Sequence, residues 1–246
     1  MEEVDQKALP AKERLIVALD VPDLASAERL VERLKGEVSH FKVGAELFTA
    51  CGPRVIEMIQ KAGAKVFLDL KYNDIPNTVA RAARAAVRLK VWMMTVHIQG
   101  GTQMLREAVS AINDEARKQK IAPPLVVGVT VLTSMGERDL ADLGIRKKVK
   151  DQVLYMAQVA QKTGLNGLVA SAKEVKVLRF SVGSEFVIVA PGIRPAGSSW
   201  ADQQRVETPA TALKAGATYL VVGRPITEAA DPIKAAQAIL QEMETQ

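Results

Sequence analysis

The chain has 246 residues, of which 48% are hydrophobic and 25% charged, and it carries a formal net charge of +5. This length can build a sizeable core in one or two domains, and the mixed charges exclude wholesale disorder. Aromatic residues make up only 4% and the basic residues are scattered, so the composition argues against a nucleic-acid-binding protein.

The first residues, MEEVDQKALPAKER, are charged and lack the apolar core of a signal peptide. No apolar run approaches the roughly 20 residues that span a bilayer. Cys51 is the only cysteine and His40 and His97 are the only histidines, so we expect neither a disulfide nor a metal site. The sequence therefore predicts a soluble, cytoplasmic protein without a membrane partner, in which residues 1–13 form an extension before the first strand.

Eight short runs rich in Val, Ile and Leu recur along the chain. They are LIVALD (15–20), FKVGAEL (41–47), KVFLDLK (65–71), VWMMTVHI (91–98), LVVGVTVL (125–132), GLVAS (167–171), FVIVAPG (186–192) and YLVVGRPI (219–226). Almost continuous apolar runs are typical of parallel strands that are covered on both faces. Helix-like stretches separate them, and in the first one Leu24, Ala27 and Val31 share one face.

This alternation of eight strands and eight helical stretches predicts a (β/α)8 TIM barrel that spans residues 1–246 as a single α/β domain. A doubly wound open sheet is the alternative, but it rarely needs eight strands at this length.

Polar side chains occur where most of the predicted strands end. They are Asp20, Lys42, Asp69, Lys71, His97, Thr133, Ser134, Arg194 and Arg224. In a barrel of this kind the chemistry collects at this end of the strands, so we expect these side chains to surround one site. We interpret His97 as a packing or hydrogen-bonding residue rather than a catalytic one.

The stretch FLDLKYND (67–74) carries the most specific signal. Asp69 and Lys71 are two residues apart and would point with Phe67 into the barrel, while Leu68 would face the helices. Asp74 lies beyond the strand. An ammonium held between carboxylates stays charged, which makes it a fixed proton donor rather than a nucleophile. The alternative is one structural ion pair that fills the barrel mouth.

The stretch VVGRPITEAADP predicts a phosphate site at the eighth strand. Gly223 allows a backbone N–H to approach an anion, and the guanidinium of Arg224 matches phosphate geometry. APGIRPAG adds Arg194 from the neighbouring strand. A solvent-exposed arginine is the alternative interpretation of Arg224 alone.

These residues resemble a known family, the orotidine 5′-monophosphate decarboxylases in their bacterial form, over nearly the whole chain. The similar segments are ALDV (18–21), FKVG (41–44), DLKYNDIPNTV (69–79), VLTSM (131–135), PGIRP (191–195), DQQRVETP (202–209) and VVGRPIT (221–227). The resemblance implies removal of CO2 from C6 of the orotate ring to give uridine monophosphate, in pyrimidine biosynthesis, with no metal or organic cofactor.

The resemblance also implies roles for individual residues. Lys71 would protonate C6 within a charged network of Asp69, Asp74 and Lys42. Asp20 and Lys42 would contact the ribose, and Thr133 and Ser134 the pyrimidine edge. The phosphate end would be bound by Gln203, Gly223, Arg224 and Arg194, and further substrate contacts would come from Ile75, Pro76, Thr78 and Pro191. Asp74 and Thr78 would reach the partner's site in a homodimer.

The sequence departs from the family pattern at Tyr72-Asn73, Ile98-Gln99 and Ala190, none of which replaces a charged residue of the network. Two rival functions share the barrel. One is a magnesium-dependent keto-sugar-phosphate decarboxylase or hexulose-phosphate synthase, which resembles this chain but carries an acidic ligand where Lys42 stands. The other is a phosphate-ligand binding protein without catalytic activity, which would not need a costly buried charge cluster.

Overall fold

The computed structural model describes residues 9–195 and 207–244. Within these residues eight parallel strands close into a barrel in sequential order, with β8 paired to β1. The strands are β1 (Leu15–Ala18), β2 (His40–Gly44), β3 (Lys65–Tyr72), β4 (Met93–His97), β5 (Leu125–Val129), β6 (Gly167–Val169), β7 (Val187–Ala190) and β8 (Tyr219–Val222). The predicted (β/α)8 barrel is confirmed.

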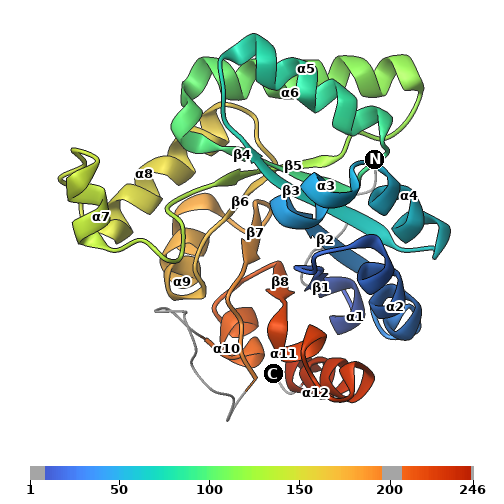
Figure 1. Cartoon of the computed structure of the whole chain (residues 1–246). Coiled ribbons are helices and arrows are strands. Elements are labelled where there is room, and N and C mark those ends of the chain that lie inside the picture. The colour runs from blue at the N-terminus through green and yellow to red at the C-terminus, as the bar shows by residue number, and fades with distance from the viewer. Residues whose placement is uncertain (1–8, 196–206, 245–246) are drawn as a thin grey trace.

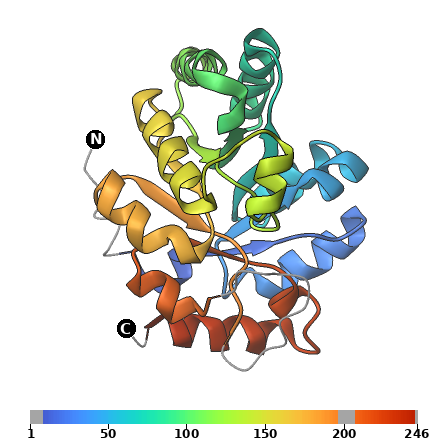
Figure 2. The same cartoon turned by 90° about the vertical axis from the view of Figure 1, so that its left-hand side faces the viewer.

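Helices surround the barrel (Figure 1). They are α1 (Ala11–Arg14), α2 (Leu24–Leu34), α3 (Ala45–Cys51), α4 (Arg54–Lys61), α5 (Pro76–Arg88), the 3-10 turn η1 (Ile98–Gly100), α6 (Gly101–Gln119), α7 (Glu137–Asp142), α8 (Val149–Lys162), α9 (Ala172–Val182), α10 (Pro209–Lys214), α11 (Arg224–Thr227) and α12 (Pro232–Glu244). Helices α5 and α6 pack side by side (Figures 1 and 2). None of the described helices is long and apolar enough to cross a membrane.

The apolar residues form two layers, as strand alternation requires. Ile16, Phe67, Met93 and Val221 belong to the cluster inside the barrel. The larger cluster lies between the strands and the helices and includes Leu68. The predicted orientation of Phe67 toward the interior and of Leu68 toward the helices is therefore confirmed.

Three aromatic rings close the end of the barrel where the strands begin. His40 starts β2, Trp92 precedes β4 and Tyr219 starts β8. The ring centroids of His40 and Trp92 lie 4.2 Å apart, and Trp92 meets Tyr219 edge-on at 5.1 Å. These three rings form an aromatic plug at this end, and we therefore expect a ligand site at the opposite end, where the strands stop.

Several predicted strands run past their real ends. β2 stops at Gly44 and α3 begins at Ala45, so the predicted strand 41–47 is too long. β5 stops at Val129, and beyond it both the N–H and the hydroxyl of Thr130 donate to the carbonyl of Val169. β8 stops at Val222, and the predicted last residues of this strand belong to α11. Beyond β5, Val131 and Leu132 of the predicted strand line the cavity at the barrel mouth.

Candidate active site

The end of β3 departs from regular strand geometry at the residues predicted to react. Leu68 pairs with Met94 and Tyr72 pairs with Val96, so four steps along β3 match two steps along β4. Lys71 adopts a φ of 51°, in the left-handed region that is uncommon for residues other than glycine. The predicted shared face of Asp69 and Lys71 is thus formed through a bulge rather than through regular strand alternation.

Four charged side chains form a row of alternating sign at this end of the barrel, which we call the charge row: Asp20, Lys42, Asp69 and Lys71. Lys42 Nζ lies 2.9 Å from Asp20 Oδ1 and 3.7 Å from Asp69 Oδ2, and Lys71 Nζ lies 2.9 Å from the same Asp69 oxygen. The side chains of Lys42 and Asp69 are 11% and 12% exposed, whereas that of Lys71 is 41% exposed. The least buried ammonium therefore faces the entrance.

A cavity of about 160 Å³ adjoins the charge row. Its polar lining comes from Lys42, Asp69, Lys71 and Thr133, and Pro191 also lines it. The remaining lining is apolar: Phe67, Val129, Val131, Leu132, Val169, Ala170 and Val221. An apolar cavity with a few charged groups on one side is typical of a site that orients a small ligand. A larger hollow of about 330 Å³ between α2 and α4 contains none of the predicted site residues.

His97 ends β4 beside this site. Its Nδ1 accepts a hydrogen bond from the Gln99 N–H at 3.4 Å, at the start of η1. Burial lowers the pKa of His97, and the positive charge of Lys71 lowers it further. A neutral imidazole that bonds its own turn agrees with the hydrogen-bonding role expected from the sequence.

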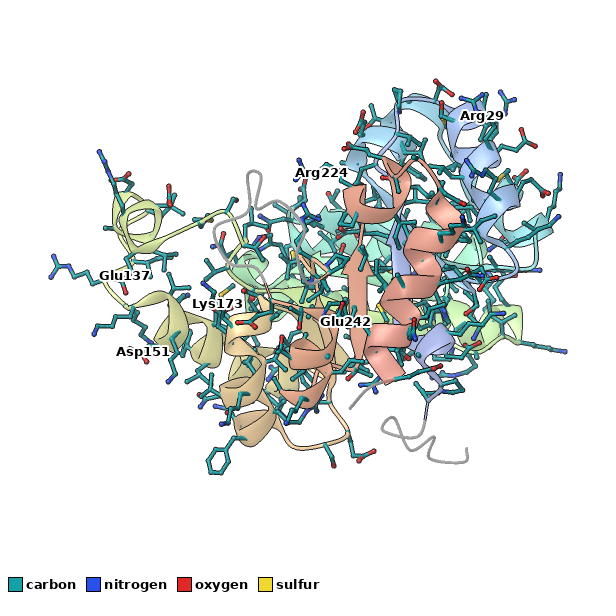
Figure 3. The ribbon with its side chains drawn as sticks, turned by 90° about the horizontal axis from the view of Figure 1, so that it is seen from below. Arg29, Glu137, Asp151, Lys173, Arg224 and Glu242 are labelled. Atoms are coloured by element: carbon teal, nitrogen blue, oxygen red, sulfur yellow. The ribbon has the colours of Figure 1, made fainter. Side chains whose placement is uncertain are left out.

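The predicted phosphate residues lie at the ends of β7 and β8. Arg224 begins α11 directly after Gly223, which is the N-cap of that helix (Figure 3). Arg194 is buried at 8% exposure, and its N–H donates to the carbonyl of Glu207 at 3.1 Å. Both arginines therefore lie beyond the carboxyl ends of neighbouring strands. Gln203 lies outside the described residues.

The loop after β3 is exposed and does not join the charge row. Asp74 Oδ1 accepts from the Ile75 N–H at 2.6 Å, and among the described residues Asp74 has no ion pair within 4.0 Å. Ile75 is 67% exposed, Thr78 is exposed and Pro76 is half-buried. Ser134 is exposed in the turn after β5 and does not line the cavity, whereas its neighbour Thr133 does.

Two residues of the site escaped the sequence analysis. Thr95 of β4 is fully buried, and its hydroxyl contacts both Asp69 and the backbone of Lys71. Gly44 leaves room for the ion pair between Lys42 and Asp20. A Cβ at this position would lie 3.0 Å from Lys42 Nζ and 3.4 Å from Asp20 Oδ1. A threonine within a strand and a glycine at a strand end are both common, so neither gave a signal.

The fold and the charge row define an enzyme of the (β/α)8-barrel class that holds ammonium groups between carboxylates at the mouth of the barrel. Within the described part of the chain, no group of three or more His, Cys, Asp or Glu side chains is placed to hold a metal ion. The family model described as "Orotidine 5′-phosphate decarboxylase / HUMPS family" matches residues 13–239. The chain belongs to this family.

Curated relatives and solved structures agree with this assignment. An orotidine 5′-phosphate decarboxylase of Moorella thermoacetica is 53% identical over 235 residues, which cover 95% of this chain and 93% of that protein. A second one, of Syntrophotalea carbinolica, is 49% identical over 233 residues and covers 95% and 96%. The crystal structure of orotidine 5′-phosphate decarboxylase from Lactobacillus acidophilus is 37% identical, with a TM-score of 0.84, and covers 95% and 100%.

Proposed function

We propose that this chain decarboxylates orotidine 5′-phosphate to uridine 5′-phosphate and CO2, a step of pyrimidine biosynthesis, without a metal or organic cofactor. The observation that carries the proposal is the charge row, in which Asp69 holds the ammonium of Lys71 at 2.9 Å beside an apolar cavity. The relatives with 53% and 49% identity that bear this activity in their names support the choice of substrate.

The difficulty of the reaction lies in the electron pair that CO2 leaves behind. When the bond from C6 to the carboxylate breaks, this pair lies in the plane of the ring, where the π system cannot delocalise it. A fixed positive charge near C6 stabilises the developing negative charge without reorganising. Lys71 would supply that charge, transfer a proton from Nζ to C6 and regain a proton from water.

The neighbouring charges would support this step. Asp69 accepts from Lys71 Nζ and would also lie near the departing carboxylate, so repulsion between the two anions would be relieved as CO2 leaves. Lys42, with Asp20 at 2.9 Å, would meet the ribose hydroxyls. Thr133 would contact the pyrimidine edge from the cavity wall, and Ser134 from the exposed turn beside it.

The phosphate would bind at the ends of β7 and β8, through Arg194, Arg224 and the backbone of Gly223, together with Gln203. A phosphate held there is distant from the bond that breaks, so its binding energy would serve to orient the ring. Removing the phosphate from the substrate is therefore expected to lower kcat as well as to raise KM.

The active form is proposed to be a homodimer in the cytoplasm. Asp74 and Thr78 are exposed and lie apart from the charge row of their own chain, and Ile75 beside them is 67% exposed. In a dimer these residues, with Pro76, would reach the partner's site, and Asp74 would bring a second carboxylate to Lys71. Mixing inactive Lys71→Ala with inactive Asp74→Ala protein tests this arrangement, because hybrid dimers would contain one intact site and regain activity.

The alternative is a magnesium-dependent keto-sugar-phosphate decarboxylase or hexulose-phosphate synthase on the same barrel. Lys42 argues against it, because its ammonium stands between Asp20 and Asp69 and would repel a divalent cation from the carboxylates that could bind one.

The deciding experiment follows the ultraviolet absorbance of orotidine 5′-phosphate as purified protein is added, with and without a chelator. We expect loss of the orotate chromophore that the chelator does not affect and that Lys71→Ala abolishes. Lys65→Ala is the matched control, because Lys65 begins the same strand at the opposite end of the barrel. Absence of turnover, together with magnesium-dependent action on a keto-sugar phosphate, would establish the alternative.

A further inference from the structure

The backbone of Lys71 adopts a left-handed conformation within the β3 segment, where this conformation is strained. The other described non-glycine residues with positive φ, Lys90 and Lys120, follow the ends of α5 and α6, where this conformation is common. Lys71 alone among them lies within a strand. A left-handed lysine at such a place persists only when its surroundings hold it.

Thr95 of β4 provides that hold. Because β3 contains two extra residues between its paired positions, Thr95 alone stands opposite Asp69, Leu70 and Lys71. The Lys71 N–H donates to Thr95 Oγ1 at 2.8 Å, so a side-chain oxygen replaces the strand carbonyl that a regular ladder would offer. Thr95 is 0% exposed, so water cannot take over this role.

The same hydroxyl also orients the carboxylate. Thr95 Oγ1 donates its single proton to Asp69 Oδ1 at 3.1 Å, which leaves its lone pairs for the Lys71 N–H. With Oδ1 occupied, Asp69 presents Oδ2 to the two ammonium groups, Lys71 Nζ at 2.9 Å and Lys42 Nζ at 3.7 Å. The hydroxyl of Thr95 thereby holds both the backbone of Lys71 and the side-chain orientation of Asp69.

We propose that Thr95 is a positioning residue that holds Lys71 and Asp69 in their reactive arrangement by bonding the backbone of the first and the carboxylate of the second. Its contribution to catalysis rests on the decarboxylation proposed above. Thr95 lies beneath the charge row and acts on the reaction through these two residues.

The test replaces Thr95 with valine, which keeps the shape and removes the hydroxyl, and with serine, which keeps the hydroxyl. In Thr95→Val we expect the single-turnover rate of decarboxylation to fall about 10- to 100-fold, the range for a lost hydrogen bond to a charged group. KM is expected to change less than about threefold, because the ground-state contacts remain. Thr95→Ser is expected to recover most of the rate.

Thr218→Val is the matched control. Thr218 is 3% exposed, and its hydroxyl accepts the backbone N–H of Ile188 at 3.1 Å, at the opposite end of the barrel. Both valine variants are expected to lose thermal stability, and only Thr95→Val is expected to lose the rate. The proposal is overturned if Thr95→Val keeps the rate of the wild type, or if Thr95→Ser is as slow as Thr95→Val.

Crystal structures of the wild-type protein and of Thr95→Val test whether Thr95 positions Lys71 and Asp69, independently of whether the protein is a decarboxylase. We expect the variant to lose the positive φ of Lys71 or the 2.9 Å contact between Asp69 Oδ2 and Lys71 Nζ. If both persist in the variant, Thr95 does not position these groups. If the wild-type protein does not consume orotidine 5′-phosphate, the proposed function fails, and the two structures still decide whether Thr95 holds Lys71 and Asp69.

Discussion

His40 is expected to make the stability of the barrel depend on pH in the mildly acidic range. It is 1% exposed within the aromatic plug, with its ring 4.2 Å from that of Trp92 and its Nδ1 3.0 Å from Ser39 Oγ. The pKa of His40 is lowered from 6.5 to about 4, chiefly by burial and also by the charge of Lys65, while the charge of Glu13 acts in the opposite direction. The imidazole is thus neutral in the folded protein at neutral pH.

The sign and the size of the effect follow from linkage. Between pH 6.5 and about 4 the unfolded chain binds a proton at His40 that the folded protein excludes, so stability falls as the pH decreases through this range and is complete above it. Moving the pKa from 6.5 to about 4 corresponds to about 3 kcal/mol, at 1.36 kcal/mol for each pKa unit.

The measurement is the free energy of unfolding in urea, followed by circular dichroism at several pH values from 4 to 8. His40→Phe keeps a ring against Trp92 and cannot titrate, so the difference between wild type and variant isolates this histidine. We expect the difference to shift by about 3 kcal/mol in favour of the variant between pH 7.5 and 4. His97→Gln is the control for the other histidine. A difference that stays constant with pH would refute the assignment of His40 as a buried neutral base.

Three further predictions concern single side chains. Lys42→Gln is expected to lower kcat/KM by at least about 100-fold in the absorbance assay, since two carboxylates lose their shared ammonium. Gly167→Ala should destabilise by about 1–3 kcal/mol in urea, because its Cβ would lie 2.2 Å from the Val187 carbonyl oxygen; Gly36→Ala, with open space, should not. Arg179→Met should cost about 2–4 kcal/mol in urea, since four carbonyls lose their donor.

The barrel could be predicted from the sequence because burial on both faces leaves a strong mark on a strand. The runs around Ile16, Phe67 and Val221 are mostly apolar, and each is followed by a helical stretch. Strand ends were predicted less well. Gly44 and Val222 are followed by short helices, α3 and α11, whose apolar residues extend the run beyond the strand, whereas Val131 and Leu132 after β5 line the cavity.

The charges of the site were predicted better than their geometry. Asp69 and Lys71 stand out in an apolar run, so the pair was visible, and the structure places them 2.9 Å apart. The bulge that brings them together depends on the register between β3 and β4, which a single strand cannot reveal. Thr95 gave no signal because threonine is common in strands, and its importance follows only from the residues opposite it.

The arrangement of charges explains why the single chain is proposed to hold an incomplete site. The charge row alternates from Asp20 through Lys42 and Asp69 to Lys71, so its two inner members each lie between two opposite charges, whereas the end members Asp20 and Lys71 are 55% and 41% exposed. Among the residues that the structure describes, Lys71 has one carboxylate partner, Asp69, and 41% of its side chain is exposed. A second carboxylate there, the proposed Asp74 of a partner subunit, would keep the ammonium centred over C6 rather than drawn down onto Asp69. Loss of that carboxylate should therefore lower kcat more than it raises KM, which distinguishes positioning of the proton donor from a simple contribution to substrate binding.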